Sequence, residues 1–497
     1  MLTASRPLYR AAGLRALEAA AAGQPLMQRA GLAAADLACA LLGERPAPVL
    51  ILAGPGNNGG DGFEAGMHLL RRDHDVRLVF AGTAAQQPAD AAAARQRFLD
   101  AGGNTLDEIP TDVRWGLIVD ALFGIGLARP LDGRFALLVS AANTLAQRDR
   151  CALLALDCPS GLDGDTGAAP GATIRATHTI TFIAEKPGLL TADGPDHAGA
   201  ITLASLALDA PSLAAPEGRT VGTEDFHGEL RPRRRNSHKG TNGSAGILGG
   251  APGMVGAAFL AGRAALQLGA GRVYLGLADG AAPAYDPAQP ELMLRSAGRL
   301  LDTGLDALAC GPGLGTGPAQ VALLERACGF DIPLLLDADA LNLLAQEGNL
   351  EIAVASRTAP TLLTPHPAEA ARLLDRDVAA VQADRIAAAG ELATQFNAYV
   401  ALKGCGTVLA TPGGHWAINT TGNPGMGSAG MGDVLSGLVV ALLAQGWPAE
   451  AALAAGVHLH GAAADALAAR IGEIGLTAGE TIPEARRLFN AWVAANA

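Results

Sequence analysis

The chain of 497 residues is 49% hydrophobic and 17% charged, and its formal net charge at pH 7 is −12. This length exceeds what one hydrophobic core supports, so the sequence predicts at least two globular domains. The acidic balance gives no general attraction to nucleic acid or acidic lipid, and neither is an expected partner. The cysteines include no C-x-x-C pair, and no segment resembles a membrane span or a signal peptide, so we expect a cytoplasmic protein with reduced thiols.

Short apolar runs alternate with longer Ala/Leu-rich stretches along the whole chain, which is typical of an α/β fold. Runs without polar alternation predict parallel strands that are buried on both faces. They lie at residues 48–54, 76–82, 116–122, 152–157 and 179–183, and then at 245–250, 272–277, 306–310, 333–337, 361–364 and 407–410. Prolines, glycines and charges cluster between the halves, so we predict a Rossmann-like three-layer domain over 1–215 and a second α/β domain over 222–497.

The first predicted strand leads directly into the loop PGNNGGDG (55–62), which opens a helix. Loops at the carboxyl ends of parallel strands are where α/β sheets bind ligands, although this loop is not the G-x-G-x-x-G dinucleotide motif. Oxygen atoms of Asn58, Asp120 and Ser160, each near a strand end, can surround one monovalent cation. Asp157, also at a strand end, is the best acid/base candidate. Turn formation and helix capping are the alternatives for the loop and for Ser160.

The motifs LMQRAG, PGNNGGDG, D-x-x-F-G-I-G-L-x-R, LDCPSGLDGDTG and TFIAEKPGL together resemble the YjeF N-terminal family, the NAD(P)H-hydrate epimerases, over about residues 8–205. The resemblance implies a potassium ion at Asn58, Asp120 and Ser160, and a substrate contact at Asp157. It also implies substrate contacts from two loops, at Asn57, Asn58, Gly59, Gly60, Asp61, Gly124, Ile125, Gly126, Leu127, Ala128, Arg129 and Pro130. Glu64 is more polar than expected at this helix start.

The stretch GNPGMGSAGMGDVLSG (422–437) places glycines and one aspartate, Asp433, before a long apolar run of helical length. Glycines permit close approach of the backbone, and N–H groups at a helix N-terminus favour an anion. We therefore predict that Asp433 is a base beside a bound phosphate group, because helix capping leaves the glycines unexplained. The chain has only three lysines, Lys186, Lys239 and Lys403, each within two residues of a glycine. We expect functional roles for them, and for Lys186 a contact to a substrate phosphate.

The segment GMGD resembles the G-x-G-D anion hole of the ribokinase-like fold, and its neighbours resemble the NAD(P)H-hydrate dehydratases over about residues 225–495. The resemblance implies hydrated-cofactor contacts at Ala257, Gly313, His366 and Asp433. It implies ADP or ATP, with Mg²⁺, at Lys403, Gly404, Cys405, Gly406, Thr407, Asn423, Pro424, Gly425, Met426, Gly427, Ser428, Ala429, Gly430, Met431 and Gly432. A satisfied structural histidine is the alternative for His366, and helix capping is the alternative for Asp337 and Asp339.

The two resemblances together imply successive steps in the repair of hydrated NADH and NADPH, the small-molecule substrates NADHX and NADPHX. The first domain would interconvert the R and S hydrates, with Asp157 moving a proton. The second would dehydrate the S hydrate in an ADP-dependent reaction, with Asp433 acting on the hydroxyl. Ala-rich helices also suggest a homo-oligomer. The alternatives are a small-alcohol kinase of the ribokinase-like class, and an N-terminal domain that serves only as an interaction module.

Overall fold

The computed structural model describes residues 3–43, 47–126 and 129–496, and it divides into two compact units. The N-terminal unit is Pro7–Glu217. The C-terminal unit begins at Gly218 and also includes the start of the described chain, residues 3–6. Within the described ranges, no helix has the length and apolar character needed to cross a membrane.

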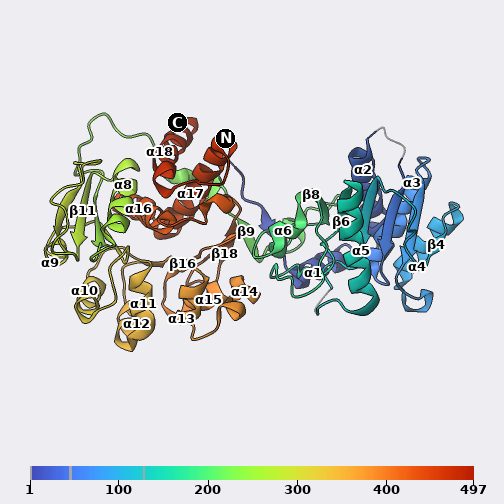
Figure 1. Cartoon of the computed structure of the whole chain (residues 1–497), viewed down its shortest axis with the longest axis horizontal. Helices are drawn as coiled ribbons and strands as arrows, with labels where there is room; N and C mark the ends of the chain where they lie inside the picture. The colour runs from blue at the N-terminus through green and yellow to red at the C-terminus, as the bar shows by residue number, and fades with distance from the viewer. Residues whose placement is uncertain (1–2, 44–46, 127–128, 497) are drawn as a thin grey trace. The chain divides into compact units, whose positions relative to one another are not determined.

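The N-terminal unit is built on a parallel sheet with the strand order β4-β3-β2-β5-β6-β7-β8 (Figure 1). Its strands are β2 (Val49–Ala53), β3 (Val76–Phe80), β4 (Thr105–Leu106), β5 (Leu117–Ala121), β6 (Ala152–Leu156), β7 (His178–Phe182) and β8 (Ala200–Ala204). Its helices are α1 (Ala11–Ala20), α2 (Leu26–Leu42), α3 (Asn57–Leu70), α4 (Ala89–Asp100), α5 (Gly133–Asp149), α6 (Gly194–Ala198) and α7 (Ala210–Leu213). The short β1 (Pro7–Leu8) forms an isolated parallel bridge with Glu185.

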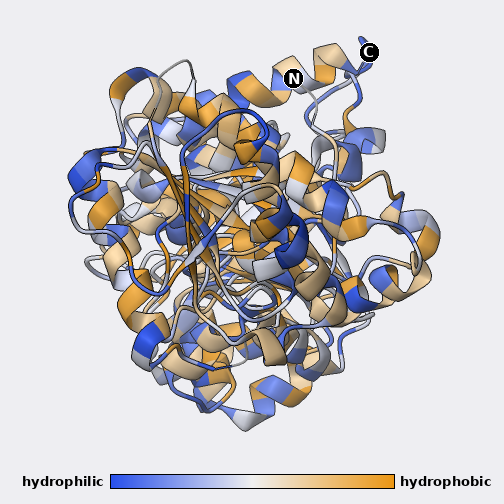
Figure 2. Cartoon of the chain, turned by 90° about the vertical axis from the view of Figure 1, so that its right-hand side faces the viewer, coloured by the Kyte–Doolittle hydropathy of each residue, from blue (hydrophilic) through white to orange (hydrophobic). Residues whose placement is uncertain are grey.

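Helices cover both faces of this sheet, because its central strands β2, β5 and β6 are apolar except for Asp120 near the end of β5. Ile51 of β2 faces one apolar core that includes residues of α1 to α4, whereas Leu50 and Leu52 face a second core with α5. Figure 2 shows hydrophobic residues concentrated on the strands and polar residues on peripheral helices and loops. The prediction of a three-layer, Rossmann-like α/β domain is confirmed.

The C-terminal unit has a mixed sheet with the strand order β9-β18-β17-β16-β15-β14-β13-β10-β11-β12. Its strands are β9 (Gly218–Thr220), β10 (Ser244–Gly249), β11 (Arg272–Leu277), β12 (Met293–Ser296), β13 (Ala307–Cys310), β14 (Leu334–Leu336), β15 (Thr361–Leu363), β16 (Tyr399–Leu402), β17 (Thr407–Ala410) and β18 (Trp416–Asn419). Its helices are α8 (Val255–Gln267), α9 (Ala297–Leu300), α10 (Pro318–Cys328), α11 (Asp339–Gln346), α12 (Gly348–Ala355), α13 (Pro367–Leu373), α14 (Val378–Ala383), α15 (Arg385–Gln395), α16 (Met431–Ala444), α17 (Ala449–Ile471) and α18 (Ala478–Ala495).

Two layers of helices enclose this sheet, with α8, α16, α17 and α18 on one face and α10 to α15 on the other (Figure 1). Helix α16 is apolar around its whole circumference, which is typical of a helix buried on every side. It packs closely on α8, since a Cβ on Gly437 would lie 2.1 Å from the carbonyl oxygen of Ala261. Helix α16 is therefore packed backbone to backbone against α8 at this point.

The sheet of the C-terminal unit is parallel from β12 to β16, and then antiparallel through β17 and β18. All eleven predicted apolar runs are strands, and the α/β class is confirmed for this unit as well. The run 407–410 belongs to the antiparallel part, where β16 and β18 were not predicted. Tight connections join these strands, so they do not show the strand–helix alternation on which the prediction rested.

The start of the chain is a correction to the predicted domain over 1–215, because residues 3–6 group with the C-terminal unit. The backbone N–H of Thr3 donates to the hydroxyl of Thr223 at 2.6 Å, and that of Ser5 donates to Glu224 at 2.6 Å. The N–H of Arg6 donates to the Thr220 hydroxyl at 2.9 Å. These bonds join residues more than two hundred positions apart, and local sequence patterns cannot reveal them.

Two candidate active sites

The N-terminal unit has a cleft of about 850 Å³ lined by the loops that follow β2, β5 and β6. The parallel register places Ala53 beside Ala121 and Asp120 beside Ala155, so these three strands end at the same edge of the sheet. Seven of the predicted substrate-binding residues line this cleft, namely Asn57, Asn58, Asp61, Gly124, Ile125, Gly126 and Asp157. The structure thus brings together residues from three distant segments.

The other predicted substrate-binding residues of this unit lie elsewhere. Gly59 and Gly60 are buried in the first turn of α3, and a Cβ on Gly59 would lie 2.0 Å from the carbonyl oxygen of Gly54. Close packing of the helix start on its own loop therefore accounts for Gly59. Arg129 and Pro130 are exposed. Leu127 and Ala128 lie outside the described residues.

Asp157 follows β6 with a left-handed φ of 67°, and 14% of its side chain is exposed. Its Oδ1 forms an ion pair with Nζ of Lys186 at 2.5 Å, and its Oδ2 accepts a hydrogen bond from the backbone N–H of Ile125 at 3.2 Å. The Lys186 side chain, which is 1% exposed, also donates to the Thr181 hydroxyl at 2.7 Å. A Cβ on Gly124 would lie 2.6 Å from Asp157 Oδ2, so a side chain at this position would displace the carboxylate. Instead of projecting toward a phosphate, Lys186 holds the candidate acid/base.

Asp120 and Ser160, two of the three predicted cation ligands, are in direct contact. The buried Asp120 carboxylate accepts hydrogen bonds from the backbone N–H of Ser160 at 2.8 Å and from its hydroxyl at 2.7 Å. Burial raises the pKa of Asp120 to about 6, although the Ser160 hydrogen bonds oppose this effect. Asn58 is 8% exposed, and neither polar atom of its amide has a hydrogen-bond partner. Buried polar groups are normally partnered, so this amide is available to a ligand.

Two further acidic side chains, Glu18 and Asp61, line the same cleft as Asp157. Burial, followed by the charge of Asp157, raises the pKa of both carboxyls, and that of Asp61 is raised well above its usual value. Glu64, the unexpectedly polar residue of α3, is 1% exposed and does not line the cleft. Its carboxylate accepts a hydrogen bond from Arg97 Nε of α4 at 2.6 Å, which gives it a structural role.

The second candidate site lies at the N-terminus of α16. Gly430 precedes this helix with a left-handed φ of 91°, and Asp433 is in its first turn. Burial raises the pKa of Asp433 to about 6, the charge of Asp337 raises it further, and the charge of Lys403 opposes them. A carboxyl that titrates near neutral pH, beside backbone N–H groups at a helix start, is suited to exchange a proton next to a bound anion.

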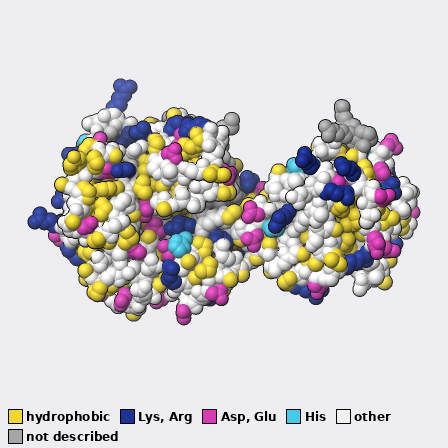
Figure 3. Space-filling view, in the orientation of Figure 1, with side chains coloured by type: hydrophobic (Ala, Val, Ile, Leu, Met, Phe, Trp, Pro, Cys, Tyr) yellow, Lys and Arg dark blue, Asp and Glu magenta, His cyan; other side chains and the backbone are white. Residues whose placement is uncertain are grey.

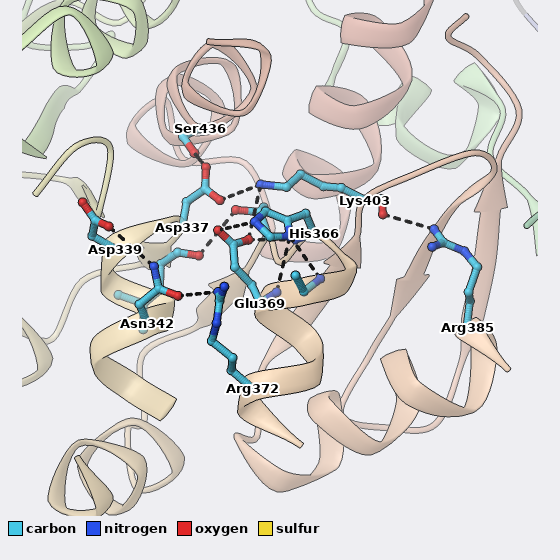
Figure 4. Close-up of polar contacts among 12 residues, drawn as sticks. Asp337, Asp339, Asn342, His366, Glu369, Arg372, Arg385, Lys403 and Ser436 are labelled. Carbon is cyan, nitrogen blue, oxygen red and sulfur yellow. Dashed lines mark hydrogen bonds and ion pairs between the residues drawn. The ribbon is translucent and has the colours of Figure 1, made fainter. Parts of the chain in front are cut away.

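The buried Asp337 forms an ion pair with Lys403, whose side chain is 21% exposed, beside this helix start (Figure 4). The Nζ of Lys403 lies 2.7 Å from Asp337 Oδ1, and the Ser436 hydroxyl donates to Asp337 Oδ2 at 2.7 Å. Burial alone would raise the pKa of Asp337, but the Lys403 ammonium and the Ser436 hydroxyl hold it below its usual value. Neither Asp337 nor Asp339 caps α11, since its N-cap is Ala338 without a side-chain cap bond. The capping alternative is therefore wrong for both.

His366 is the N-cap of α13, and Figure 4 shows its ring beside Glu369. Its Nδ1 accepts hydrogen bonds from the backbone N–H groups of Ala368 and Glu369 at 3.1 and 3.3 Å. Its Nε2 lies 3.2 Å from Glu369 Oε1, while 47% of its side chain remains exposed. The structural role that sequence left open is thus present, and the exposed ring edge also remains accessible. In the view of Figure 3, histidine, basic and acidic side chains lie close together on one face of the C-terminal unit.

Two further predicted substrate contacts are Gly313, in the loop after β13, and Ala257, in the first turn of α8. A Cβ on Gly313 would lie 3.2 Å from the Cβ of Ala257, so these two predicted contacts are neighbours. In the loop 403–407, Gly404 and Gly406 have φ values of 143° and 59°, which only glycine adopts readily. Backbone approach to a ligand is thus possible along this loop.

The loop before α16 is fixed by a residue that sequence analysis missed. Asp465 of α17 accepts hydrogen bonds from the backbone N–H of Gly422 and from the side-chain amide of Asn423, each at 2.9 Å. The Asn423 oxygen in turn accepts from the N–H of Gly425 at 3.0 Å. The Ser428 hydroxyl donates to the carbonyl of Leu476 at 3.1 Å. These contacts shape the predicted nucleotide-binding residues 423–432.

Some of the remaining polar residues near the C-terminal site could have been predicted from a sequence pattern, and others could not. Glu369 is three residues after His366, so the capping-box spacing was a signal for it. Asp465 and Ser436 lie within Ala- and Leu-rich helices and give no such signal.

Burial lowers the pKa values of His458 and His460 to about 4. His458 contacts Asn419 at 3.1 Å, and no cluster of three metal-ligating His, Cys, Asp or Glu side chains occurs in the described residues.

Comparison with known proteins gives two family matches that follow the two units. Residues 23–188 match the model of the YjeF-related protein N-terminus, and residues 245–484 match the model of NAD(P)H-hydrate dehydratase. Among solved structures, the ADP/ATP-dependent NAD(P)H-hydrate dehydratase from Bacillus subtilis, co-crystallised with ATP and Mg²⁺, is 31% identical. The likeness covers 54% of this chain and 96% of that one, with a TM-score of 0.49.

Similar curated proteins match both units at once. The bifunctional NAD(P)H-hydrate repair enzyme Nnr of Escherichia coli is 40% identical over 453 residues, which are 89% of this chain and 85% of that protein. The bifunctional NAD(P)H-hydrate repair enzyme of Leishmania braziliensis is 37% identical over 99% of this chain and 95% of its own length. Because identity at this level extends through both units and both sites, the chain belongs to the family of bifunctional NAD(P)H-hydrate repair enzymes.

Proposed function

We propose that the N-terminal unit interconverts the R and S hydrates of NADH and NADPH, and that the C-terminal unit dehydrates the S hydrate with the help of ADP or ATP. The observation that carries this proposal is a pair of separate carboxylate sites, Asp157 in one unit and Asp433 in the other, each near a lysine. A kinase of small alcohols would use only the second of these sites. Membership of the repair-enzyme family supports the same division.

In the N-terminal unit, Asp157 would move the proton on the hydroxyl-bearing carbon or its hydroxyl group. Lys186 and the N–H of Ile125 fix its two oxygens, so the carboxylate has one defined orientation toward the cleft. Positioning of a reacting group in this way lowers the entropic cost of reaction. The cleft volume of about 850 Å³ is large enough for a dinucleotide portion, and apolar and polar residues both line it.

The residues Asn58, Asp120 and Ser160 are proposed to hold a potassium ion. The unpartnered amide of Asn58 and the buried carboxylate of Asp120 fit this role, because hard cations take oxygen ligands. When bound, the ion would offset the charge of Asp120 and attract anionic groups of the substrate. The contacts between Asp120 and Ser160 already fix two of the three side chains relative to each other.

In the C-terminal unit, N–H groups at the start of α16 and in the loop 403–407 are proposed to bind nucleotide phosphates. Gly430, with φ of 91°, and Gly432 leave the backbone open at the helix start. Asp433 would take the proton of the substrate hydroxyl as its oxygen attacks the terminal phosphate of the nucleotide, and the C–O bond would then break with loss of inorganic phosphate. Ala257, Gly313 and His366 would contact the hydrated nicotinamide. Mg²⁺ would accompany the nucleotide and offset phosphate charge.

The test is incubation of the purified chain with a mixture of R and S hydrates, with and without ADP or ATP, while NADH absorbance is followed. We expect full conversion of both hydrates only when nucleotide is present. Asp433→Asn should lower dehydration by at least about 1,000-fold and leave epimerisation intact. Asp157→Asn should do the reverse. Loss of both activities in each single variant would overturn the division of labour, and phosphorylation of a small alcohol would favour a kinase.

A further inference from the structure

Asp337 is the most completely enclosed acidic side chain near Asp433, with 1% of its surface exposed. It comes directly after β14, and its two carboxylate oxygens bind two different elements. Oδ1 binds Lys403, which follows β16, and Oδ2 accepts the hydroxyl of Ser436 on α16. One buried side chain thus ties two segments of the sheet edge to the helix that carries Asp433.

This network lies directly against the start of α16. A Cβ placed on Gly432 would lie 3.3 Å from Lys403 Nζ and 3.5 Å from Asp337 Oδ2. Ser436 is three residues after Asp433, so the two side chains share one face of the helix. The ion pair therefore adjoins the backbone that precedes Asp433, and it also adjoins the proposed phosphate-binding N–H groups.

The charges around Asp433 come from four neighbouring elements. Asp337 and Asp339 act to raise its pKa, while Lys403 acts to lower it. Glu369 of α13 lies 4.0 Å from Lys403, and the buried His460 of α17 is also near that ammonium. The lysine charge is therefore shared with two carboxylates and reaches Asp433 only in part, which is consistent with a pKa of about 6.

We propose that Asp337 is a positioning residue of the dehydration reaction, which occupies the Lys403 ammonium and anchors Ser436 on the helix that carries Asp433. This inference rests on the proposed dehydratase function of the C-terminal unit. Without the Asp337 charge, Lys403 would act in full on Asp433 and on the phosphate site. Asp433 would then be a weaker base, and the anion hole would attract a nucleotide more strongly.

The test compares wild type, Asp337→Asn and the double variant Asp337→Asn/Lys403→Met in the dehydration of S hydrate at saturating ADP. In Asp337→Asn we expect the acidic limb of the pH–rate profile to move down by about 1 pH unit. We also expect kcat to fall about tenfold, while KM for ADP falls or stays unchanged. In the double variant both charges are gone, so the limb should return toward the wild-type position. Removal of both partners also avoids an unpaired buried charge that threatens folding.

The matched control is Asp286→Asn, because Asp286 is a fully buried carboxylate paired with Arg263 outside this network. We expect this variant to lose stability without a shift of the acidic limb. Thermal unfolding followed by tryptophan fluorescence reports in every variant whether the C-terminal unit is folded, because three of the four tryptophans, at 416, 447 and 492, lie in that unit. The inference would be overturned if the acidic limb of the pH–rate profile lay at the same pH in Asp337→Asn as in wild type. It would also be overturned if the limb of the double variant did not move back toward the wild-type pH. A wild type that leaves S hydrate unchanged would instead refute the proposed function itself.

Discussion

Each unit places one lysine among acidic side chains at the carboxyl edge of its sheet, but the two lysines have different partners. In the N-terminal unit, Lys186 binds Asp157, the proposed catalytic carboxylate, directly at 2.5 Å. In the C-terminal unit, Lys403 binds Asp337 at 2.7 Å, and the proposed catalytic Asp433 lies beyond this pair. The same two residue types are therefore combined in two different orders.

The difference has a chemical consequence. A direct ion pair fixes the orientation of Asp157, whose left-handed backbone and glycine neighbour already restrict it. An indirect pair leaves the Asp433 carboxyl free of that lysine and keeps its pKa at about 6, where it exchanges protons near neutral pH. The comparison teaches that a lysine near a catalytic carboxylate can either orient it or adjust its proton affinity from a distance.

Removal of Lys186 is expected to have the largest effect, and it tests whether the direct ion pair orients Asp157. If the direct pair orients Asp157, Lys186→Met should lower epimerisation by about 100-fold or more, because Asp157 loses its buried partner. Dehydration of pure S hydrate should remain near wild type. The measurement is the rate at which R hydrate is converted to NADH in the presence of ADP, since R hydrate must first be epimerised.

The functional role that the sequence predicts for Lys239 has no support in the structure, because its side chain is exposed and does not line the N-terminal cleft. Lys239→Met is therefore the matched control for this experiment. We expect it to keep both activities. Normal epimerisation by a folded Lys186→Met variant would show that the direct pair has no role in positioning, and the contrast between the two units would lose its basis.

The sequence predicted the fold class and the edges that carry the sites better than it predicted the function of single residues. Apolar strands that end in glycine-rich loops are local patterns, so the loops at Asn58 and Asp433 were visible. The partners of the lysines were not, because Asp157 and Lys186 lie 29 positions apart and Asp337 and Lys403 lie 66 apart. Such pairs depend on strand order, which a single sequence does not reveal.

The sequence suggested a phosphate contact for Lys186 because a single sequence does not reveal that this lysine is paired with Asp157. A lysine near a glycine is typical of phosphate sites, and nothing in TFIAEKPGL shows that this ammonium is buried beside Asp157. Asp465 was missed for a related reason, since it belongs to a long Ala-rich helix and contacts a loop some forty residues earlier. Local capping patterns, as at His366, are the contacts that spacing can predict.

The potassium dependence of epimerisation tests the proposed cation site, which only the N-terminal unit is proposed to have. Protonation of Asp120, whose pKa is raised to about 6, removes the negative charge that the proposed cation site needs. A proton and a potassium ion should therefore compete, and the apparent potassium affinity should weaken about tenfold for each pH unit below that pKa. The measurement is the epimerisation rate as a function of potassium concentration, one pH unit above and one below the pKa of Asp120.

Choline chloride at equal ionic strength is the control for this titration, because it changes screening without offering a cation that fits oxygen ligands. Dehydration of S hydrate should show no comparable competition. An epimerisation rate that is independent of potassium at both pH values would refute the proposed cation site at Asn58, Asp120 and Ser160, while the direct pair of Asp157 with Lys186 would stand.

The smallest expected effect concerns the loop that presents the phosphate-binding backbone to Asp433. Asp465→Asn keeps one acceptor oxygen but replaces the other with an N–H donor, so one of the two bonds to Gly422 and Asn423 is lost. A loss of about 1 kcal/mol in loop order should raise KM for ADP about fivefold, with kcat and the acidic limb nearly unchanged. Steady-state kinetics at several ADP concentrations measures this. A fall in kcat without a change in KM would instead mean that Asp465 acts on Asp433, and that the nucleotide loop and the proton-transfer network are one unit.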